Sequence, residues 1–190
     1  MARLDLYSAL LEKWNPVINL VSKSTLAETW TRHFLDSAQI FDLCPQNAQS
    51  WADLGSGGGF PGLVIAILGA ERVPNLRVTL VESDVRKATF LNTVAREVGV
   101  SVAIRPDRIE SLPPLASDVL SARALAPLDQ LLSFAARHLA AGGVALFPKG
   151  ASYADELAKA RENWAFSVEE TQSKTDPNAV ILGIKGFAHV

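Results

Sequence analysis

The twelve residues Trp51–Gly62, WADLGSGGGFPG, contain five glycines and one proline between two apolar runs. Glycine contributes no side-chain packing and loses more backbone entropy on folding than any other residue. Such a density of glycine indicates that another group must approach the backbone closely at this point. The flanking runs SWADL and PGLVIAILGA predict a short strand before the glycines and a buried helix after them.

The spacing of these glycines fits two kinds of cofactor. Gly57, Gly59 and Gly62 satisfy G-x-G-x-x-G, the fingerprint of dinucleotide binding. Counted from Asp53, the pattern is instead D-x-G-x-G-x-G, in which Gly55 is the first glycine after the strand, and this pattern resembles the first motif of S-adenosylmethionine-dependent methyltransferases. A strand-to-helix turn without a ligand is the third interpretation, although such a turn needs only one or two glycines.

Residues outside the glycine run also suit a nucleoside ligand. Phe60 stands where a dinucleotide fingerprint counted from the strand end has its last glycine, and its ring can line a methionine tail. Glu82 ends the second predicted strand, where a carboxylate can accept hydrogen bonds from ribose hydroxyls. Ile109 can lie against an adenine, with Glu110 or Asp107 near its amino group. Both cofactors contain adenosine, so these residues support a nucleoside site without separating the two.

The remaining chemistry-bearing residues restrict the reaction. Cys44 is the only cysteine, which excludes an internal disulfide, and no sequence pattern supports it as a nucleophile for pyrimidine methylation. The three histidines, His33, His138 and His189, are too scattered for a metal site. The NPVI segment at Asn15 lacks the second proline and the aromatic residue of amine-methylating turns. A ring nitrogen with a free lone pair, such as guanine N7, needs positioning but no general base.

The elements that position these residues alternate along the chain. Residues 1–49 predict a helical lead-in, with one helix over 4–14 and a second up to Leu43 that begins at Ser24 or Thr25, with Glu28 completing a capping box. Predicted strands and helices then follow in the order 50–54 (strand), 61–70 (helix), 76–82 (strand), 84–99 (helix), 100–105 (strand), 117–123 (strand), 128–143 (helix stopped at Gly142), 143–150 (strand) and 152–163 (helix). A closing antiparallel hairpin is expected from 165–173 and 178–187.

This alternation predicts an α/β fold with a mainly parallel sheet and helices on both faces. Ligands of such sheets bind at the carboxyl ends of the strands, at the switch point of the strand order. The glycine run directly follows the first strand, so the ligand is expected there. In the predicted helix over 84–99, an apolar stripe is expected at Val85, Ala88, Leu91, Val94 and Val98.

Composition limits the class of protein. The chain of 190 residues is 48% hydrophobic, has a net charge of −2 and contains no apolar run long enough for a transmembrane helix. It has no signal-peptide core, so we expect a cytoplasmic protein. A domain that binds nucleic acid through bulk phosphate attraction is usually basic, so the charge by itself slightly favours an enzyme for small molecules.

Together, the motifs resemble those of the bacterial 16S rRNA guanine-N7 methyltransferase family RsmG, also called GidB. The resemblance covers most of the chain, and the order and spacing of the segments make it specific. The segments that carry it are KWNPVINLVSKST, RHFLDS (Arg32–Ser37), DLGSGGGFPG, ESDVRKATFL, RIE, SARALAPL and FPKG (Phe147–Gly150). Two features depart from the family: the lead-in before Trp14 is short, and the net charge is negative.

The resemblance implies a class I S-adenosylmethionine-dependent methyltransferase of Rossmann-like fold, a single domain over 1–190 with its core in 50–190, acting as a monomer. The implied partner is 16S rRNA, in the small ribosomal subunit or an assembly intermediate of it. The cofactor residues that it implies are Asp53, Gly55, Gly57, Phe60, Glu82, Ile109, Glu110 and Arg123. Arg123 is also the expected catalytic residue, by positioning the substrate, and the expected RNA contacts are Arg32, His33 and Lys149.

Several alternatives stay open at this point. The Arg123 guanidinium can orient guanine O6 or a phosphate, or it can form an ion pair with Asp118 or Asp129. Asp36 can anchor helix packing rather than face a ligand. A methyltransferase for small molecules and a non-catalytic ribosome-binding module of the same fold are the rival functions.

Overall fold

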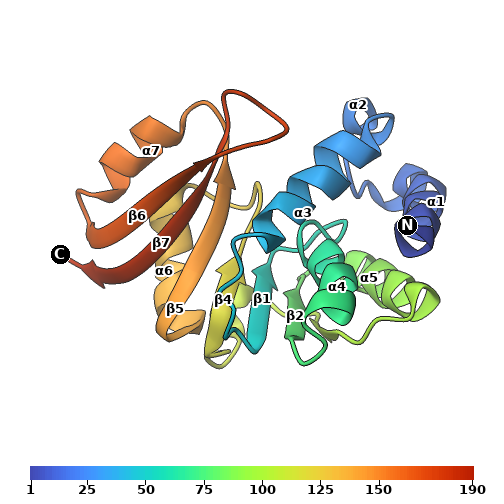
Figure 1. The fold of residues 1–190 in the computed structure, drawn as a ribbon, viewed down its shortest axis with the longest axis horizontal. Coiled ribbons are helices and arrows are strands. Elements are labelled where there is room, and N and C mark those ends of the chain that lie inside the picture. The colour runs from blue at the N-terminus through green and yellow to red at the C-terminus, as the bar shows by residue number, and fades with distance from the viewer.

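The computed structural model describes residues 1–190, which form a seven-stranded sheet with helices on both faces (Figure 1). The strand order is β3-β2-β1-β4-β5-β7-β6. Strands β1 to β5 run parallel to one another, whereas β7 is antiparallel to both β5 and β6. The expected mainly parallel sheet with a closing antiparallel hairpin is therefore confirmed.

The predicted strands and helices occur in the predicted order along the chain. The strands are β1 (Ser50–Leu54), β2 (Arg77–Val81), β3 (Ala103–Arg105), β4 (Ser117–Ser121), β5 (Leu139–Lys149), β6 (Trp164–Gln172) and β7 (Val180–His189). The helices are α1 (Ala2–Ile18), α2 (Lys23–Leu26), η1 (Trp30–Leu35), α3 (Asp36–Phe41), α4 (Gly62–Arg72), α5 (Val85–Val98), η2 (Ile109–Ser111), α6 (Leu128–His138) and α7 (Tyr153–Ala160).

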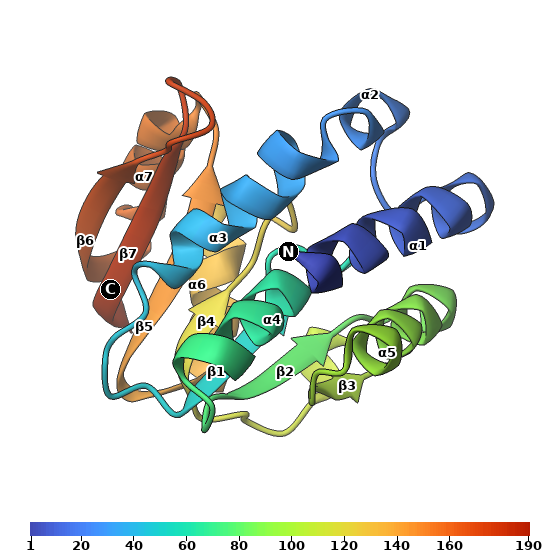
Figure 2. The same cartoon turned by 45° about the vertical axis from the view of Figure 1, so that its right-hand side comes forward.

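Alternating strand residues divide the apolar core between the two faces of the sheet. Trp51 of β1 lies in the cluster that packs under α1, α3, α4 and α5, whereas Leu54 lies in the cluster under α6 and α7. In β4, Val119 lies in the first of these clusters and Leu120 in the second. This alternation follows from the two-residue period of strands. Figure 2 shows α1 crossing beside α4 and α5, so the lead-in belongs to the first of these two layers.

The second helix of the lead-in differs from the prediction. Its first turn is α2, capped by Ser22, whose Oγ accepts from Thr25 N at 3.3 Å. The expected caps at Ser24 or Thr25 are therefore wrong by two or three residues, and Glu28 completes no capping box. The chain then enters the wider π-helical turn η1 before it returns to α-helix in α3. Such π turns are rare and often occur at functional sites.

Two expectations about the later elements are also wrong. The helix expected to run to Gly142 ends at His138, because from Leu139 the chain pairs with β4 and becomes the start of β5. Gly142, at φ +78°, lies within that strand and does not cap a helix. Val85 is 67% exposed and does not belong to the apolar stripe of α5, because it is the first residue of the helix.

The carboxyl ends of the central strands position the site. Leu54, Val81 and Ser121 end the strands β1, β2 and β4, which lie side by side in the order β2-β1-β4. From β1 the strands β2 and β3 extend the sheet to one side and β4 and β5 extend it to the other, so the strand order switches between β1 and β4. The loops after these three strands therefore lie at the switch point, where ligands of open α/β sheets bind. No helix is both long and apolar enough to cross a membrane.

Candidate active site

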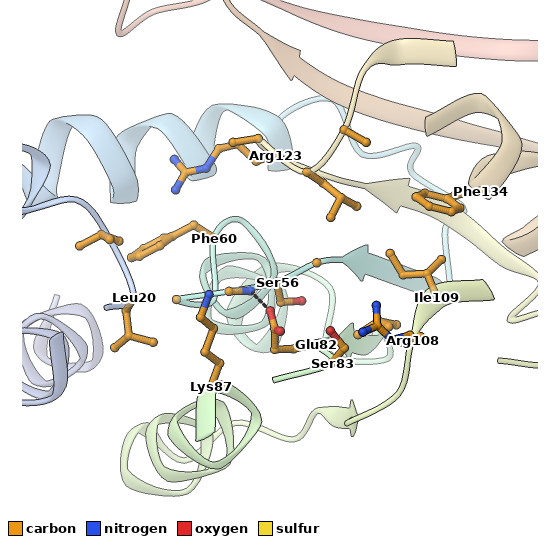
Figure 3. A pocket seen from close by; sticks show the side chains of 18 of the residues that line it. Leu20, Ser56, Phe60, Glu82, Ser83, Lys87, Arg108, Ile109, Arg123 and Phe134 are labelled. Carbon is orange, nitrogen blue, oxygen red and sulfur yellow. Dashed lines mark hydrogen bonds between the residues drawn. The ribbon is translucent and has the colours of Figure 1, made fainter. Parts of the chain in front are cut away.

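A cavity of about 520 Å³ opens at the carboxyl ends of β1, β2 and β4. Its volume is within the range of small-molecule sites. Figure 3 shows Leu20, Phe60 and Arg123 toward one end, Arg108, Ile109 and Phe134 toward the other, and Glu82 between them. The sequence-predicted residues that line this cavity are His33, Gly55, Gly57, Phe60, Glu82, Asp107, Ile109, Glu110 and Arg123. We call it the donor cavity below.

The glycine loop presents bare backbone to the donor cavity. Gly55 has φ +65°, and a Cβ added there would lie 2.6 Å from Leu125 Cδ1. At Gly57 the nearest atom to an added Cβ is Gly55 O, 3.8 Å away, so only the absence of a side chain leaves this space open. Gly57 N donates to Glu82 Oε2 at 2.8 Å, and Asp84 N donates to Glu82 Oε1 at 2.8 Å. A carboxylate accepts about four hydrogen bonds, so Glu82 keeps capacity for two ribose hydroxyls.

Asp53 holds this loop from below and does not face the cavity. Its side chain is fully buried, accepts from Gly62 N at 3.1 Å and accepts from Ser121 Oγ at 2.7 Å. A Cβ on Gly62 would lie 2.8 Å from Asp53 Cβ, which explains why the last glycine of the loop begins α4. Burial raises the pKa of the Asp53 carboxyl to about 6, against the lowering effect of its hydrogen bonds. Asp53 thus positions the loop rather than contacting a ligand.

The N-terminal helices form one wall of the donor cavity. Leu20, Val21 and Ser22 line it, in the turn between α1 and α2. The buried Asn15 shapes this turn, since its Oδ1 accepts from Leu20 N at 2.8 Å and from Val21 N at 2.9 Å. Tyr7 of α1 donates its hydroxyl to Gly58 O. The lead-in is therefore bonded directly to the glycine loop.

The opposite end of the cavity is held by the last turn of α6. Ile109 begins the short helix η2, and its carbonyl oxygen lies 2.9 Å from Nε2 of the buried His138. Arg137 donates from Nε and Nη2 to Leu112 O, at 3.1 and 2.7 Å. Two consecutive side chains of α6 therefore fix the loop that carries Ile109 and Glu110.

Arg123 follows β4 and joins three parts of the lead-in. Its Nη1 donates to Arg32 O and to Asp36 Oδ2, each at 3.1 Å, and its Nη2 lies 3.0 Å from His33 Nδ1. The guanidinium carbon also lies 5.2 Å from the centre of the Phe60 ring. Neither of the two carboxylates considered from the sequence, Asp118 and Asp129, forms an ion pair with Arg123; the partner is Asp36.

A second and wider cavity of about 910 Å³ adjoins the first. The two share a wall made of His33, Arg123 and the segment Ala124–Ala126. From this wall the second cavity extends between η1 and α3, the end of β5 and α7, and the loop from Ser173 to Asp176. We call it the acceptor cavity, because a molecule bound in it would meet one bound in the donor cavity at Arg123.

The whole chain matches proteins of one family. The family described as rRNA small subunit methyltransferase G, GidB, matches residues 1–180. The chain belongs to this family. A ribosomal RNA small subunit methyltransferase G from Ruegeria sp. (strain TM1040) is 55% identical over 190 residues, which cover all of this chain and 92% of that protein.

Solved structures of other proteins share the fold. A predicted O-methyltransferase from Agrobacterium tumefaciens has a TM-score of 0.62 at 18% identity, and the match covers 78% of this chain and 79% of that one. An MtNAS variant in complex with S-adenosylmethionine also has a TM-score of 0.62, at 17% identity, covering 96% and 74% of the two chains. Membership of the GidB family makes this protein an S-adenosylmethionine-dependent methyltransferase. The solved structures show that its fold is the class I fold, as the sequence motifs implied.

The three residues expected to contact RNA, Arg32, His33 and Lys149, differ in their exposure. All three line the acceptor cavity, but only Arg32 is substantially exposed, with an ion pair to Asp176 at 3.9 Å. His33 is buried and hydrogen-bonded through both ring nitrogens. Lys149 is 9% exposed and donates to Glu156 Oε2 at 2.7 Å and to Ala126 O at 3.0 Å. Lys149 therefore supports the shared wall of the two cavities.

Other residues of the site were not singled out from the sequence. Gln130 and Phe134 of α6 line the donor cavity, as do Ser83 and Lys87 near α5. No local pattern distinguishes Gln130 and Phe134 from ordinary helix residues, whereas Ser83 and Lys87 belong to ESDVRKATFL, one of the segments of the family resemblance. The role of Tyr7 could not be predicted from the sequence either, because its hydrogen-bond partner Gly58 is 51 residues away. The NLVS segment, by contrast, was already part of the family resemblance.

Proposed function

We propose that this protein transfers a methyl group from S-adenosylmethionine to N7 of a guanine in the 16S rRNA of the small ribosomal subunit. The observation that carries the proposal is the wall shared by the two cavities, which holds a guanidinium and no free base. His33 and Asp36 are the only titratable partners of Arg123 there, and both are already hydrogen-bonded. This arrangement favours a reaction that needs no removal of a proton.

Guanine N7 meets this requirement. Its lone pair lies in the ring plane and is free, so the nitrogen can accept the methyl group without a base. The bound donor supplies a sulfonium whose S–CH₃ bond breaks as the N7–CH₃ bond forms, and the positive charge passes to the base. The protein's contribution is then positioning, which can provide most of the acceleration.

Residues of the donor cavity would hold the donor along its length. Glu82 would accept from the ribose hydroxyls, and Ile109 and Glu110 would contact the adenine. Gly55 and Gly57 leave room for the methionine portion, and Phe60 would line it. In this arrangement the methyl group would face Arg123, at the opening to the acceptor cavity. The order of Ile109, Glu82, Phe60 and Arg123 along the cavity in Figure 3 supports this direction.

For the RNA, we infer contacts at the exposed cations that line the acceptor cavity. Arg32 and Lys159 are both exposed and line it. We further propose that residues 1–190 act as one unit, as a monomer in the cytoplasm, on the small subunit or an assembly intermediate. Residues 1–49 and 50–190 contribute jointly to each cavity, which supports their action as one unit.

The test uses a strain lacking the gene and complementation by wild-type or Arg123→Ala protein. We expect the N7-methylguanine content of small-subunit RNA, measured by mass spectrometry, to fall in the deletion strain and to return only with the wild type. In vitro, Arg123→Ala should lower kcat by about 100-fold or more while the donor Kd changes by less than about threefold. An unchanged N7-methylguanine content in the deletion strain would contradict the proposal and favour a small-molecule substrate.

A further inference from the structure

His33 sits between Arg123 and the lead-in with both ring nitrogens engaged. Its Nδ1 lies 3.0 Å from Arg123 Nη2, and its Nε2 lies 3.0 Å from Thr25 Oγ1. A guanidinium can only donate, so Nδ1 must be the acceptor. The proton of the neutral ring is then on Nε2, where it is donated to Thr25. The Thr25 hydroxyl in turn donates a hydrogen bond to Ser22 O, 3.1 Å away.

The surroundings keep this imidazole neutral. His33 is 7% exposed, and its ring stacks on Phe60 with centroids 4.7 Å apart and planes inclined by 23°. The charged and titratable groups around it are Arg123, Asp36 and Arg32. Burial lowers the pKa of His33 to about 4, and the Arg123 cation acts in the same direction, whereas Asp36 opposes them. At neutral pH the ring therefore offers Arg123 a lone pair rather than a second positive charge.

The contacts of Arg123 leave one part of its guanidinium unused. A guanidinium carries five N–H groups. Arg32 O and Asp36 take the two on Nη1, and His33 takes one on Nη2. The Nε–H and the second N–H on Nη2 have no protein partner. Arg123 lines both the donor cavity and the acceptor cavity, so a molecule bound at the wall they share could accept from these two groups.

We propose that His33 is a positioning residue that turns Arg123 so that its remaining N–H groups meet O6 of the target guanine. This inference rests on the proposed function. Guanine carries O6 next to N7, and an N–H group bonded to O6 alone leaves the N7 lone pair free for the methyl group. Adenine presents an amino group at the same place, so its N–H would oppose those of Arg123. The His33–Arg123 pair thus contributes to the choice of base.

Two variants separate the hydrogen bond from the ring. His33→Phe keeps a ring that can stack on Phe60 but removes the acceptor for Arg123. His33→Asn removes the ring but places an amide oxygen near the position of Nδ1. With small ribosomal subunits from the deletion strain as substrate, we expect His33→Phe to lower kcat at least tenfold with a donor Kd within about threefold of wild type. His33→Asn should recover most of that loss.

The exposed His189 provides the matched control, because it lies outside both cavities. His189→Phe should leave kcat and the donor Kd unchanged. A kcat for His33→Phe within twofold of wild type would overturn the inference. Equal losses for His33→Phe and His33→Asn, with wild-type melting temperatures, would also overturn it, because the acceptor would then not be the cause.

A measurement on the wild-type protein covers the case in which the variants do not fold. The ¹⁵N shifts of His33 at pH 7 should show a neutral ring protonated on Nε2. A ring protonated on Nδ1, or an imidazolium, contradicts the inference. This result does not depend on turnover, so it can be separated from failure of the proposed function, in which the wild type would transfer no methyl group to the subunits.

Discussion

At the scale of the residue, the side chain of His138 supports one end of the donor cavity. His138 is fully buried, and Ile109 O can only accept a hydrogen bond, so the imidazole must carry its proton on Nε2. Its Nδ1 then has no partner, and burial lowers the pKa of the ring. A buried polar atom without a partner is costly. The cost is tolerated here because the other nitrogen fixes the loop that we expect to hold the adenine.

His138→Leu should therefore weaken donor binding. The substitution leaves the Ile109 carbonyl buried without a donor, which costs about 1–3 kcal/mol of stability, and the loop becomes free to move. We expect the donor Kd, measured by calorimetry, to rise about tenfold, while kcat at saturating donor stays within twofold. His138→Gln, which retains an N–H group, should bind within about threefold of wild type. A normal Kd in His138→Leu would reduce the role of this residue to packing.

Gly55 allows a test in which the backbone cost is matched. Gly55 and Gly142 both have positive φ, +65° and +78°, so alanine strains the backbone at either site. Only at Gly55 would the new Cβ collide, 2.6 Å from Leu125 Cδ1, whereas nothing lies within 4 Å at Gly142. Both variants should lose about 1 kcal/mol of stability from the strain, and at Gly55 the end of the Leu125 side chain must also shift.

Only Gly55→Ala should lose donor affinity, by at least tenfold in a calorimetric titration. Gly142→Ala should bind the donor like the wild type. Equal affinities in the two variants would show that the cavity tolerates a side chain at this point of the loop, against the placement proposed here.

At the scale of elements, the lead-in is part of the donor site. Helix α1 contacts the glycine loop through Tyr7, and the turn after α1 supplies Leu20, Val21 and Ser22 to the cavity wall. The π-helical turn η1 then places His33 and Arg32 next to Arg123. The helices of the lead-in, which precede the strands in the sequence, therefore line both cavities.

Asn15→Leu should show this dependence. It removes the oxygen that accepts from Leu20 N and Val21 N, so the turn loses its shape. We expect a donor Kd about tenfold higher and a free energy of unfolding lower by about 1–3 kcal/mol. Asn15→Asp retains an acceptor and should stay close to wild type in both measurements.

Asn92 of α5 gives the control for this prediction. Its Nδ2 donates to Ala88 O at 3.0 Å, and it lines neither cavity. Asn92→Leu should leave donor affinity unchanged. If Asn15→Leu lowers stability and still binds the donor normally, the turn after α1 is not a functional wall.

At the scale of the whole molecule, the buried carboxyl of Asp53 links the site to stability. Trp51 Nε1 donates to Ser121 Oγ at 2.9 Å, and Ser121 in turn donates to Asp53. These contacts join β1, β4 and the start of α4. Burial nevertheless raises the pKa of Asp53 to about 6, well above the value of about 3.9 in an unfolded chain.

This difference predicts how stability depends on pH. Between about pH 4 and 6 the folded protein binds the Asp53 proton more tightly than the unfolded chain, so this contribution is present below about pH 4 and is lost as pH rises through 6. The full loss is about 3 kcal/mol. The free energy of unfolding in urea, measured for wild type and Asp53→Asn from pH 4 to 7, should show the wild type losing this amount relative to the variant.

The comparison with the variant cancels groups that titrate in both proteins, such as Asp84 and Asp118, whose pKa values hydrogen bonds hold low. A constant difference between wild type and Asp53→Asn across this range would mean that Asp53 titrates normally. The Asp53 carboxyl would then be hydrated rather than buried beneath the glycine loop.

Local patterns were sufficient for the order of strands and helices, the glycine loop and the closing hairpin. Period, caps and glycine act over a few residues, so the sequence carries them directly, as at Asp84, which caps α5, and Gly99, which ends it. One exception arose where pairing with a distant strand prevailed, at Leu139, which leaves the expected helix to pair with Ser117. Another is the second helix of the lead-in, which is capped by Ser22 and widens into the π-helical turn η1.

The assignment of individual side chains required the packed molecule. Arg123 lies 87 residues from Asp36, and Lys149 is buried against Ala126 and Glu156 although it looks like a free cation in sequence. Asp53 has the position of a ligand-binding acid in its motif but supports the loop from beneath. Such partners are set by how the lead-in and α6 dock on the sheet, and docking depends on contacts between residues that no local period relates.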